Sequence, residues 1–179
     1  SGNEFASGVY FKSGGQLISS TVIDNRYNGG ANARVAGICA YNGAVTVRNS
    51  IVAENGPLEA ADANAVCGSS GSFAYDHACT APLPASGSGN VLASGRIVSE
   101  TDGLPYPAAG SPVIGQGVYE PGWMEGAVDL AGNPRVRTTG GVSTIDIGAY
   151  QSDVSATILT ATCELPELLY DRATIKVTA

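Results

Sequence analysis

Apolar and polar residues alternate along residues 16–25 (QLISSTVIDN), and the same pattern returns thirty positions later along residues 46–55 (TVRNSIVAEN). The aligned pairs are Leu17–Val47, Ser19–Asn49, Thr21–Ile51, Ile23–Ala53 and Asn25–Asn55. A period near thirty residues with strand-like alternation is typical of solenoids, in which each repeat buries its apolar side only by stacking on the next. The pattern therefore predicts a parallel β-helix.

The residues that precede each of these segments repeat as well. Residues 8–15 match residues 37–44 with a slip of one position. Along each long strand we expect the odd positions to face inward and the even positions outward, because side chains alternate across a strand. Val22 and Val52 would then be apolar and outward-facing, beneath a flanking loop or a partner.

Polar residues also fall at equivalent positions of the two repeats. Ser19 above Asn49 forms an inward pair, and a buried amide is costly unless it is hydrogen-bonded. Stacked strands allow such an amide to bond to the neighbouring strand. Asn25 above Asn55, at the corner, is interpreted in the same way. The sequence therefore predicts a polar ladder made by these four residues.

Beyond residue 55 the pattern fades. Pro and Gly recur at short intervals between residues 56 and 125, which predicts ordered coil and short strands. Residues 157–163 and 173–179 are strand-like, and they either lie along the flank or begin a following β-sandwich. We expect residues 1–151 to hold the stacked strands and a closing module, and residues 152–179 to form a C-terminal β-strand tail.

The most specific motif lies between residues 129 and 148. Asp129 can accept hydrogen bonds from backbone N–H groups two residues on, Gly132 supplies a left-handed conformer and Pro134 fixes the exit of the turn. We expect Arg135 to pair with Asp146 or Asp129 and to fix this turn to the strand that follows. The motif residues are Asp129, Gly132, Asn133, Pro134, Arg135, Asp146 and Gly148.

Three runs, taken together, resemble a known family. These are residues 110–114 (GSPVI), 129–135 (DLAGNPR) and 145–150 (IDIGAY). In that order they look like the C-terminal part of bacterial right-handed parallel β-helix proteins, the choice-of-anchor or polymorphic outer-membrane-like group. Gly115 and Gln151 stand where that family usually has Asp and Glu. The resemblance implies export and a cell-surface setting, and it implies no catalytic activity.

Composition narrows the functional class. Only 14% of the residues are charged, the formal net charge is −7, and no cluster of Lys or Arg is present, so a nucleic-acid surface is not expected. No apolar run reaches the ~18 residues of a membrane span. The four cysteines and the single His77 do not show metal-ligand spacing, so we expect neither a metal nor another cofactor.

Disulfides in an exported protein are the interpretation favoured for the cysteines. Cys67 and Cys79 flank a short loop and a strand, and we expect them to form the first bond. Cys39 is expected to point outward on its strand, where a second bond to Cys163 would fasten the tail to the flank.

A catalytic interpretation would use carboxylates on one face of the stacked strands. The candidates are Asp24, Glu54, Asp62, Asp76, Asp102, Asp129 and Asp146. Asp24 and Glu54 are the best pair, because the thirty-residue offset places them on neighbouring strands, about 5 Å apart. The structural alternative is a solvated corner beside the asparagine ladder. His77 has no paired nucleophile and is interpreted as structural. Whether the chain is an enzyme stays open, and the sequence leans against it.

Aromatic residues offer candidate binding surfaces. Trp123, the single tryptophan, is expected to cover the end of the core, with an exposed ligand platform as the alternative. A set of tyrosines is a candidate for stacking on sugars: Tyr10, Tyr41, Tyr106 and Tyr119.

The sequence thus predicts an all-β chain: the end segment of a right-handed parallel β-helix with a C-terminal β-strand appendage. The favoured function is an exported, non-enzymatic structural or adhesive protein at the cell surface or outside the cell, with a glycan or a protein as its ligand. Two alternatives remain. One is the non-catalytic end of a larger polysaccharide-degrading enzyme. The other is a surface or filament subunit that self-assembles through its C-terminal strand.

Overall fold

The computed structural model describes residues 5–25, 34–55, 64–95, 97–101, 103–152, 160–164 and 174–178. Within these ranges the chain forms strands joined by turns, and no helix is present. The strands make two four-stranded parallel sheets and three two-stranded antiparallel sheets. The all-β part of the prediction therefore describes the structure.

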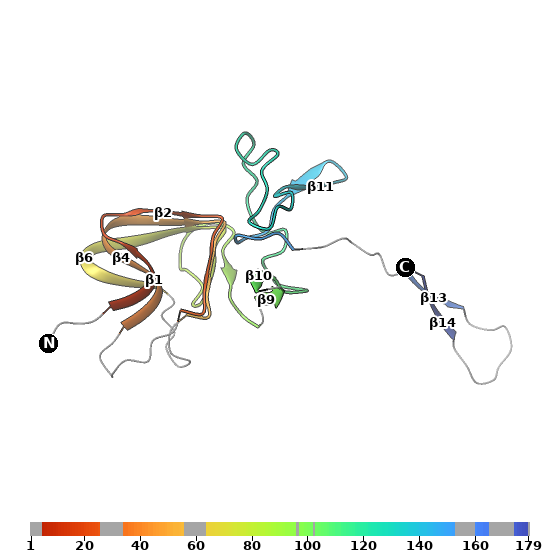
Figure 1. Cartoon of the computed structure of the whole chain (residues 1–179), viewed down its shortest axis with the longest axis horizontal. Coiled ribbons are helices and arrows are strands. Elements are labelled where there is room, and N and C mark those ends of the chain that lie inside the picture. The colour runs from red at the N-terminus through yellow and green to blue at the C-terminus, as the bar shows by residue number, and fades with distance from the viewer. Residues whose placement is uncertain are drawn as a thin grey trace.

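The first parallel sheet is centred on the long strand β4. Strands β1 and β2 pair in turn with the two halves of β4, and β6 pairs with its other edge (Figure 1). The bounds are β1 Phe5–Phe11, β2 Gly15–Ile18, β4 Arg34–Arg48 and β6 Asn64–Asp76.

The second parallel sheet contains four short strands in the order β3-β5-β7-β8. Their bounds are β3 Thr21–Ile23, β5 Ile51–Ala53, β7 Cys79–Thr80 and β8 Val91–Leu92. The thirty-residue alignment of the sequence is the register of both sheets, since Leu17 pairs with Val47 and Ile23 with Ala53. The one-residue slip is present too, because Val9 pairs with Ile38.

Each predicted long strand is in fact broken at its middle. Ser19 and Asn49 both have φ 47°, in the left-handed region, which ends one strand and starts the next in a different sheet. The inward and outward faces therefore do not alternate through the break. Val22 and Val52, which we expected to face outward, are buried in the core, and that prediction was wrong.

The core lies on both sides of the second sheet. The cluster between the two parallel sheets consists of Leu17, Val22, Ile38, Ala40, Val45, Val47, Val52 and Ala78. The cluster on the opposite side consists of Ile51, Ala53, Cys79, Ile97, Val98, Val113 and Ile147. The neighbours Ile51 and Val52 fall in different clusters because successive side chains point to opposite faces of a strand. The outer face of the second sheet is thus covered by residues that follow β8 in the chain, namely Ile97, Val98, Val113 and Ile147.

The predicted right-handed parallel β-helix is contradicted. The described residues form several small sheets of short strands, and no closed solenoid is present among them. The physical reason lies in the second half of the chain. After β8 the pairings become antiparallel, in β9 (Val98–Thr101) with β10 (Leu104–Pro107) and in β11 (Arg137–Thr139) with β12 (Val142–Thr144). Hairpins of this kind do not continue a parallel stack. A repeat in sequence predicted the pairing of neighbouring strands, but it did not determine how the chain closes.

The C-terminal tail contains β13 (Thr160–Glu164) and β14 (Thr174–Thr178), which pair with each other in antiparallel fashion. The division of the chain at residue 151 stays a prediction. In the part of the chain that the structure describes, no helix has the length and apolarity needed to cross a membrane.

Candidate functional site

A corner joins the two parallel sheets, and left-handed residues occupy it on three neighbouring strands. Ser19, Asn49 and His77 have φ of 47°, 47° and 50°. The backbone N–H of Ser19 donates to the carbonyl oxygen of Arg48 (3.0 Å), that of Asn49 to Asp76 (3.1 Å) and that of His77 to Ser88 (2.7 Å). Each corner is thereby hydrogen-bonded to the next. As a result, the polar residues at the corners, and those that end the preceding strands, lie side by side.

Asn49 connects this corner to a distant loop. Its side chain is fully buried, and its amide donates to the carbonyl oxygen of Val118 (2.9 Å) and accepts from the N–H of Val118 (2.8 Å). Its own carbonyl oxygen accepts from the N–H of Gly148 (2.9 Å). Asn49 therefore holds residues 117–126 and the closing motif against the corner. We had expected it to bond to the neighbouring strand.

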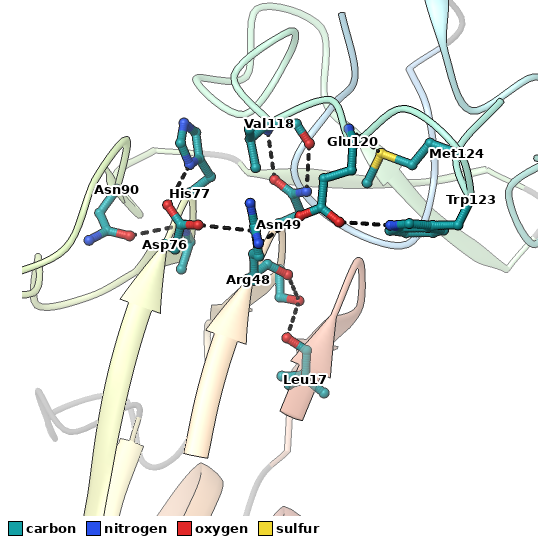
Figure 2. A network of polar contacts seen from close by, with 12 residues as sticks. Leu17, Arg48, Asn49, Asp76, His77, Asn90, Val118, Glu120, Trp123 and Met124 are labelled. Atoms are coloured by element: carbon teal, nitrogen blue, oxygen red, sulfur yellow. Dashed lines mark hydrogen bonds and ion pairs between the residues drawn. The ribbon is translucent and has the colours of Figure 1, made fainter. Parts of the chain in front are cut away.

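Five side chains form a continuous line of polar contacts across the corner (Figure 2). We call it the corner row; its members are Arg48, Asp76, His77, Glu120 and Trp123. His77 Nδ1 lies 2.8 Å from Asp76 Oδ1, and Asp76 Oδ2 lies 3.0 Å from Arg48 Nε. Arg48 Nη1 lies 2.7 Å from Glu120 Oε1, and the indole N–H of Trp123 donates to Glu120 Oε2 (2.7 Å).

The corner row is open to solvent along its length. The side chains of Arg48, Asp76, Glu120 and His77 are 35%, 33%, 30% and 26% exposed. Trp123 is 51% exposed, so the expectation that it covers the end of the core was wrong. The core position in this turn belongs to the neighbouring Met124, which is fully buried and whose sulfur accepts from the N–H of Glu120 (3.2 Å).

A second exposed aromatic feature lies on the first parallel sheet. Tyr10 and Tyr41 are 51% and 40% exposed, and their ring centroids are 6.2 Å apart. Beside Tyr41, the Ser70 hydroxyl donates to the side-chain oxygen of Asn42 (3.0 Å). Tyr106, by contrast, packs on the buried Tyr150 at 5.1 Å. Tyr119 donates its hydroxyl to Glu125 (3.0 Å).

Asn25 and Asn55 are hydrogen-bonded to each other as predicted, whereas Ser19 and Asn49 lie on neighbouring corners without a side-chain hydrogen bond between them. Asn55 Oδ1 accepts from the backbone N–H (3.0 Å) and the side-chain amide (2.8 Å) of Asn25, and Asn55 Nδ2 donates to the carbonyl oxygen of Val22 (2.8 Å). The hydroxyl of Ser19 has no hydrogen-bond partner, because Asn49 is engaged with Val118.

Asp24 and Glu54, the alternative catalytic pair, occupy a second left-handed corner. Their φ values are 56° and 55°, and both are exposed. The strands that precede them, β3 and β5, pair in register, so the two residues lie on neighbouring turns. This position agrees with the structural alternative to catalysis, which is a solvated corner beside the asparagine ladder.

The closing motif is built around two buried carboxylates. Asp129 accepts from the N–H groups of Ala131 (2.8 Å), Asn133 (2.9 Å) and Gln151 (2.9 Å). Burial alone would raise its pKa, but the donors from Gln151, Asn133 and Ala131 outweigh burial and hold the pKa of Asp129 below its ordinary value. The left-handed Gly132 (φ 86°) and the exposed Pro134 complete this turn.

The expected partner of Arg135 was wrong. Its buried guanidinium donates to the carbonyl oxygens of Ala149 (3.0 Å) and Gly148 (2.6 Å). Burial lowers the pKa of Arg135, against the opposing effect of Asp129 and then Asp146. The ion pair with Asp146 is made instead by Arg137.

Asp146 also accepts from the N–H of Gly115 (2.7 Å) and from the N–H and hydroxyl of Ser152 (both 2.6 Å). Gly148 has φ 118°, and a Cβ there would lie 2.8 Å from Ile51 Cδ1, so this position requires glycine.

The expected disulfide between Cys67 and Cys79 is contradicted. Cys79 is a free, fully buried thiol in the outer core cluster. Burial, with a smaller contribution from the Glu54 carboxylate, raises the pKa of Cys79 to about 12. Cys39 is disulfide-bonded and 2% exposed. The side chains of Cys67 and Cys163 lie outside those that the structure describes, so the predicted bond to Cys163 stays a prediction.

A scan of protein-family models and searches of the curated proteins and the solved structures found no match for this chain. The resemblance to exported β-helix proteins therefore stays a prediction. No group of three or more metal-ligating side chains occurs among the described residues.

Sequence reasoning did not bring the corner row together. Asp76 was only one of seven candidate carboxylates, and Arg48 and Glu120 were not candidates. No short motif links these three residues, because they come from distant segments. Arg48 aligns with the uncharged Ile18 of the preceding repeat, so no charge recurs at this position of the two repeats. For Trp123 the sequence left an exposed position as the alternative, and the side chain is exposed; a ligand platform there stays a prediction.

Proposed function

We propose that this chain is an exported, non-enzymatic structural or adhesive protein that binds a glycan or a protein partner through its exposed aromatic surface. The observation that carries the proposal is that the corner row combines paired charged groups with an exposed aromatic ring. Its charged groups are joined to one another and brace the sheet corner, while the Trp123 ring stays half exposed on this rigid frame. Such a frame presents a binding surface with little conformational freedom left to lose.

Two structural facts support a binding function over catalysis. Catalytic carboxylates and histidines require access to the reacting atoms, with a geometry suited to proton transfer. In the corner row, both Asp76 oxygens and both Glu120 oxygens contact groups of the row itself. Catalytic groups usually lie in a concave, partly dry site, whereas Asp24 and Glu54, the catalytic alternative, are exposed at the corner that follows β3 and β5.

A binding assay run beside a turnover assay tests the proposal. The purified chain is immobilised and exposed to a glycan array and to cell-surface extracts, and the same glycans are incubated with it, with and without Ca²⁺, to detect new reducing ends or unsaturated products. We expect retention without turnover. Turnover that disappears in Asp24→Asn or Glu54→Gln would refute the proposal and favour the polysaccharide-degrading alternative.

A further inference from the structure

The Trp123 ring is positioned before any ligand arrives. Its indole N–H is already bonded to Glu120, so the exposed part of the side chain is mainly the apolar ring. The buried Met124 anchors the same turn, and Asn49 holds the preceding Val118 by two hydrogen bonds. A ring fixed in this way loses little side-chain entropy when a flat, weakly polar surface stacks on it.

Beside this ring, the corner row offers hydrogen-bonding groups of both kinds. Arg48 has five N–H donors. Its Nη1 lies 2.7 Å from Glu120, while its Nε, 3.0 Å from Asp76, is buried and makes no hydrogen bond, so the Nη groups are the donors that a ligand could reach. The Asp76 and Glu120 carboxylates are one-third exposed, and each oxygen has two lone pairs, so they can accept from further donors. Aromatic stacking beside mixed donors and acceptors matches the two sides of a sugar ring, which has apolar C–H faces and a hydroxyl rim.

At the far end of the row, the backbone of Gly89 packs against the ring of His77. A Cβ at this position would lie 2.3 Å from Cδ2 and 2.4 Å from Nε2 of His77. Gly89 also has φ 58°, so a side chain is disfavoured there by conformation as well. Nδ1 of His77 faces Asp76 and its Nε2 edge lies against Gly89, so a ligand would meet only the quarter of this side chain that is exposed.

The charge of the row selects among ligands. It holds two carboxylates and one guanidinium, and a neutral imidazole leaves it with one net negative charge, within a chain of net charge −7. An acidic glycan or a phosphate group would meet like charge at Asp76 and Glu120, and it would have to compete with them for Arg48. A neutral glycan is not repelled by these carboxylates and does not compete with them for the charge of Arg48.

From these contacts we infer that the corner row is the binding site of a neutral oligosaccharide, with one sugar stacked on Trp123 and the following sugars hydrogen-bonded along Arg48, Asp76 and His77 (Figure 2). The inference rests on the proposed function, since it names the ligand class and the site of that binding activity. Arg48 and Asp76, at the ends of β4 and β6, are partners in register and contact each other at 3.0 Å, so a single sugar could contact both groups.

Isothermal titration calorimetry of the full chain tests the site. The probes are four neutral hexasaccharides, made of β-1,4-linked glucose, xylose, mannose or N-acetylglucosamine, and hexagalacturonate as the acidic counterpart. We expect at least one neutral probe to bind and the acidic probe to bind at least tenfold more weakly. Trp123→Ala should weaken the neutral interaction at least tenfold. Leu130→Ala, which removes an apolar side chain that is 78% exposed and lies outside the row, is the control and should change it less than twofold.

His77→Asn, which suits the left-handed corner, should weaken binding without unfolding the chain. Thermal melts of all variants exclude unfolding as the cause. Binding that survives Trp123→Ala, a preference for hexagalacturonate, or no binding to any neutral probe would overturn the assignment of this site and leave the adhesive function standing. Cleavage of a bound probe would overturn the adhesive function and leave the site standing.

Discussion

Asn49 is the residue whose replacement should destabilise the protein most clearly, because three parts of the chain meet there. Asn49→Gly keeps the left-handed backbone and removes both hydrogen bonds to Val118. Leaving two backbone groups unpaired costs about 2–6 kcal/mol if both are buried. Val118 is partly exposed, so water can reach part of it, and we expect the lower half of that range, about 2–3 kcal/mol.

Asn49→Ala adds a second effect at the same position. A residue with a Cβ in the left-handed region costs roughly 1–2 kcal/mol. The alanine variant should therefore be less stable than the glycine variant by about 1 kcal/mol, although glycine is the poorer residue elsewhere in strands. Asn25→Ala is the control, since it removes a partly exposed amide from the second corner and should cost about 1 kcal/mol.

Urea unfolding curves followed by far-ultraviolet circular dichroism, with the disulfide kept oxidised, give the free energies. The reasoning predicts the order of stability wild type, Asn25→Ala, Asn49→Gly and Asn49→Ala. A result in which Asn49→Ala is as stable as Asn25→Ala would show that the contact with Val118 does not hold the loop. A result in which alanine is better than glycine at position 49 would refute the left-handed corner.

Three further predictions concern buried groups. Cys79 should resist alkylation in the native state up to about pH 10, because its thiol is fully buried with a pKa of about 12; it should react once urea unfolds the chain, as mass spectrometry of an unreduced sample would show. Arg137→Ala should lower the stability by about 3–5 kcal/mol, since it leaves the Asp146 carboxylate buried without its cation, while Lys12→Ala at an exposed site should change it by less than 0.5 kcal/mol. The pKa of Asp129 is lowered in the folded state, so its ionisation adds stability above the unfolded-state pKa, near 3.8, and this stability is lost as the pH falls through the folded-state pKa. Asp129→Asn should therefore make the free energy of unfolding less dependent on pH on the acid side. An unchanged pH dependence there would contradict the prediction.

The sequence predicted which strands lie beside each other, because equivalent apolar residues recur at a fixed spacing. The pairings Leu17 with Val47 and Ile23 with Ala53 follow from that spacing alone. It did not predict the break at Asn49. An asparagine is compatible both with a buried ladder and with a left-handed corner, and only the backbone conformation distinguishes them.

The missed parts of the site have a common cause. Asn49 bonds to the backbone of Val118, 69 residues away, and backbone groups leave no mark in a residue pattern. Arg135 and Arg137 are two residues apart, so both stood within reach of Asp146 in the sequence, and the choice between them depends on how the turn before them is oriented. The Cys67–Cys79 prediction failed for a different reason, since proximity along the chain says nothing about burial, and Cys79 belongs to the core.

The contact between Thr21 and Ala149 joins an early and a late segment of the chain, so the second sheet can be covered only late in synthesis. The Thr21 hydroxyl accepts from the N–H of Ala149 across 128 positions, and Ile51 finds its cover in Val113 and Ile147. Translation proceeds at about 5–20 residues per second, so roughly 5–20 s pass between the appearance of Ile51 and that of Ile147. During this interval the outer face of the second sheet is apolar and uncovered on the ribosome-bound chain. That face therefore stays available for non-native apolar contacts until residues 145–149 emerge.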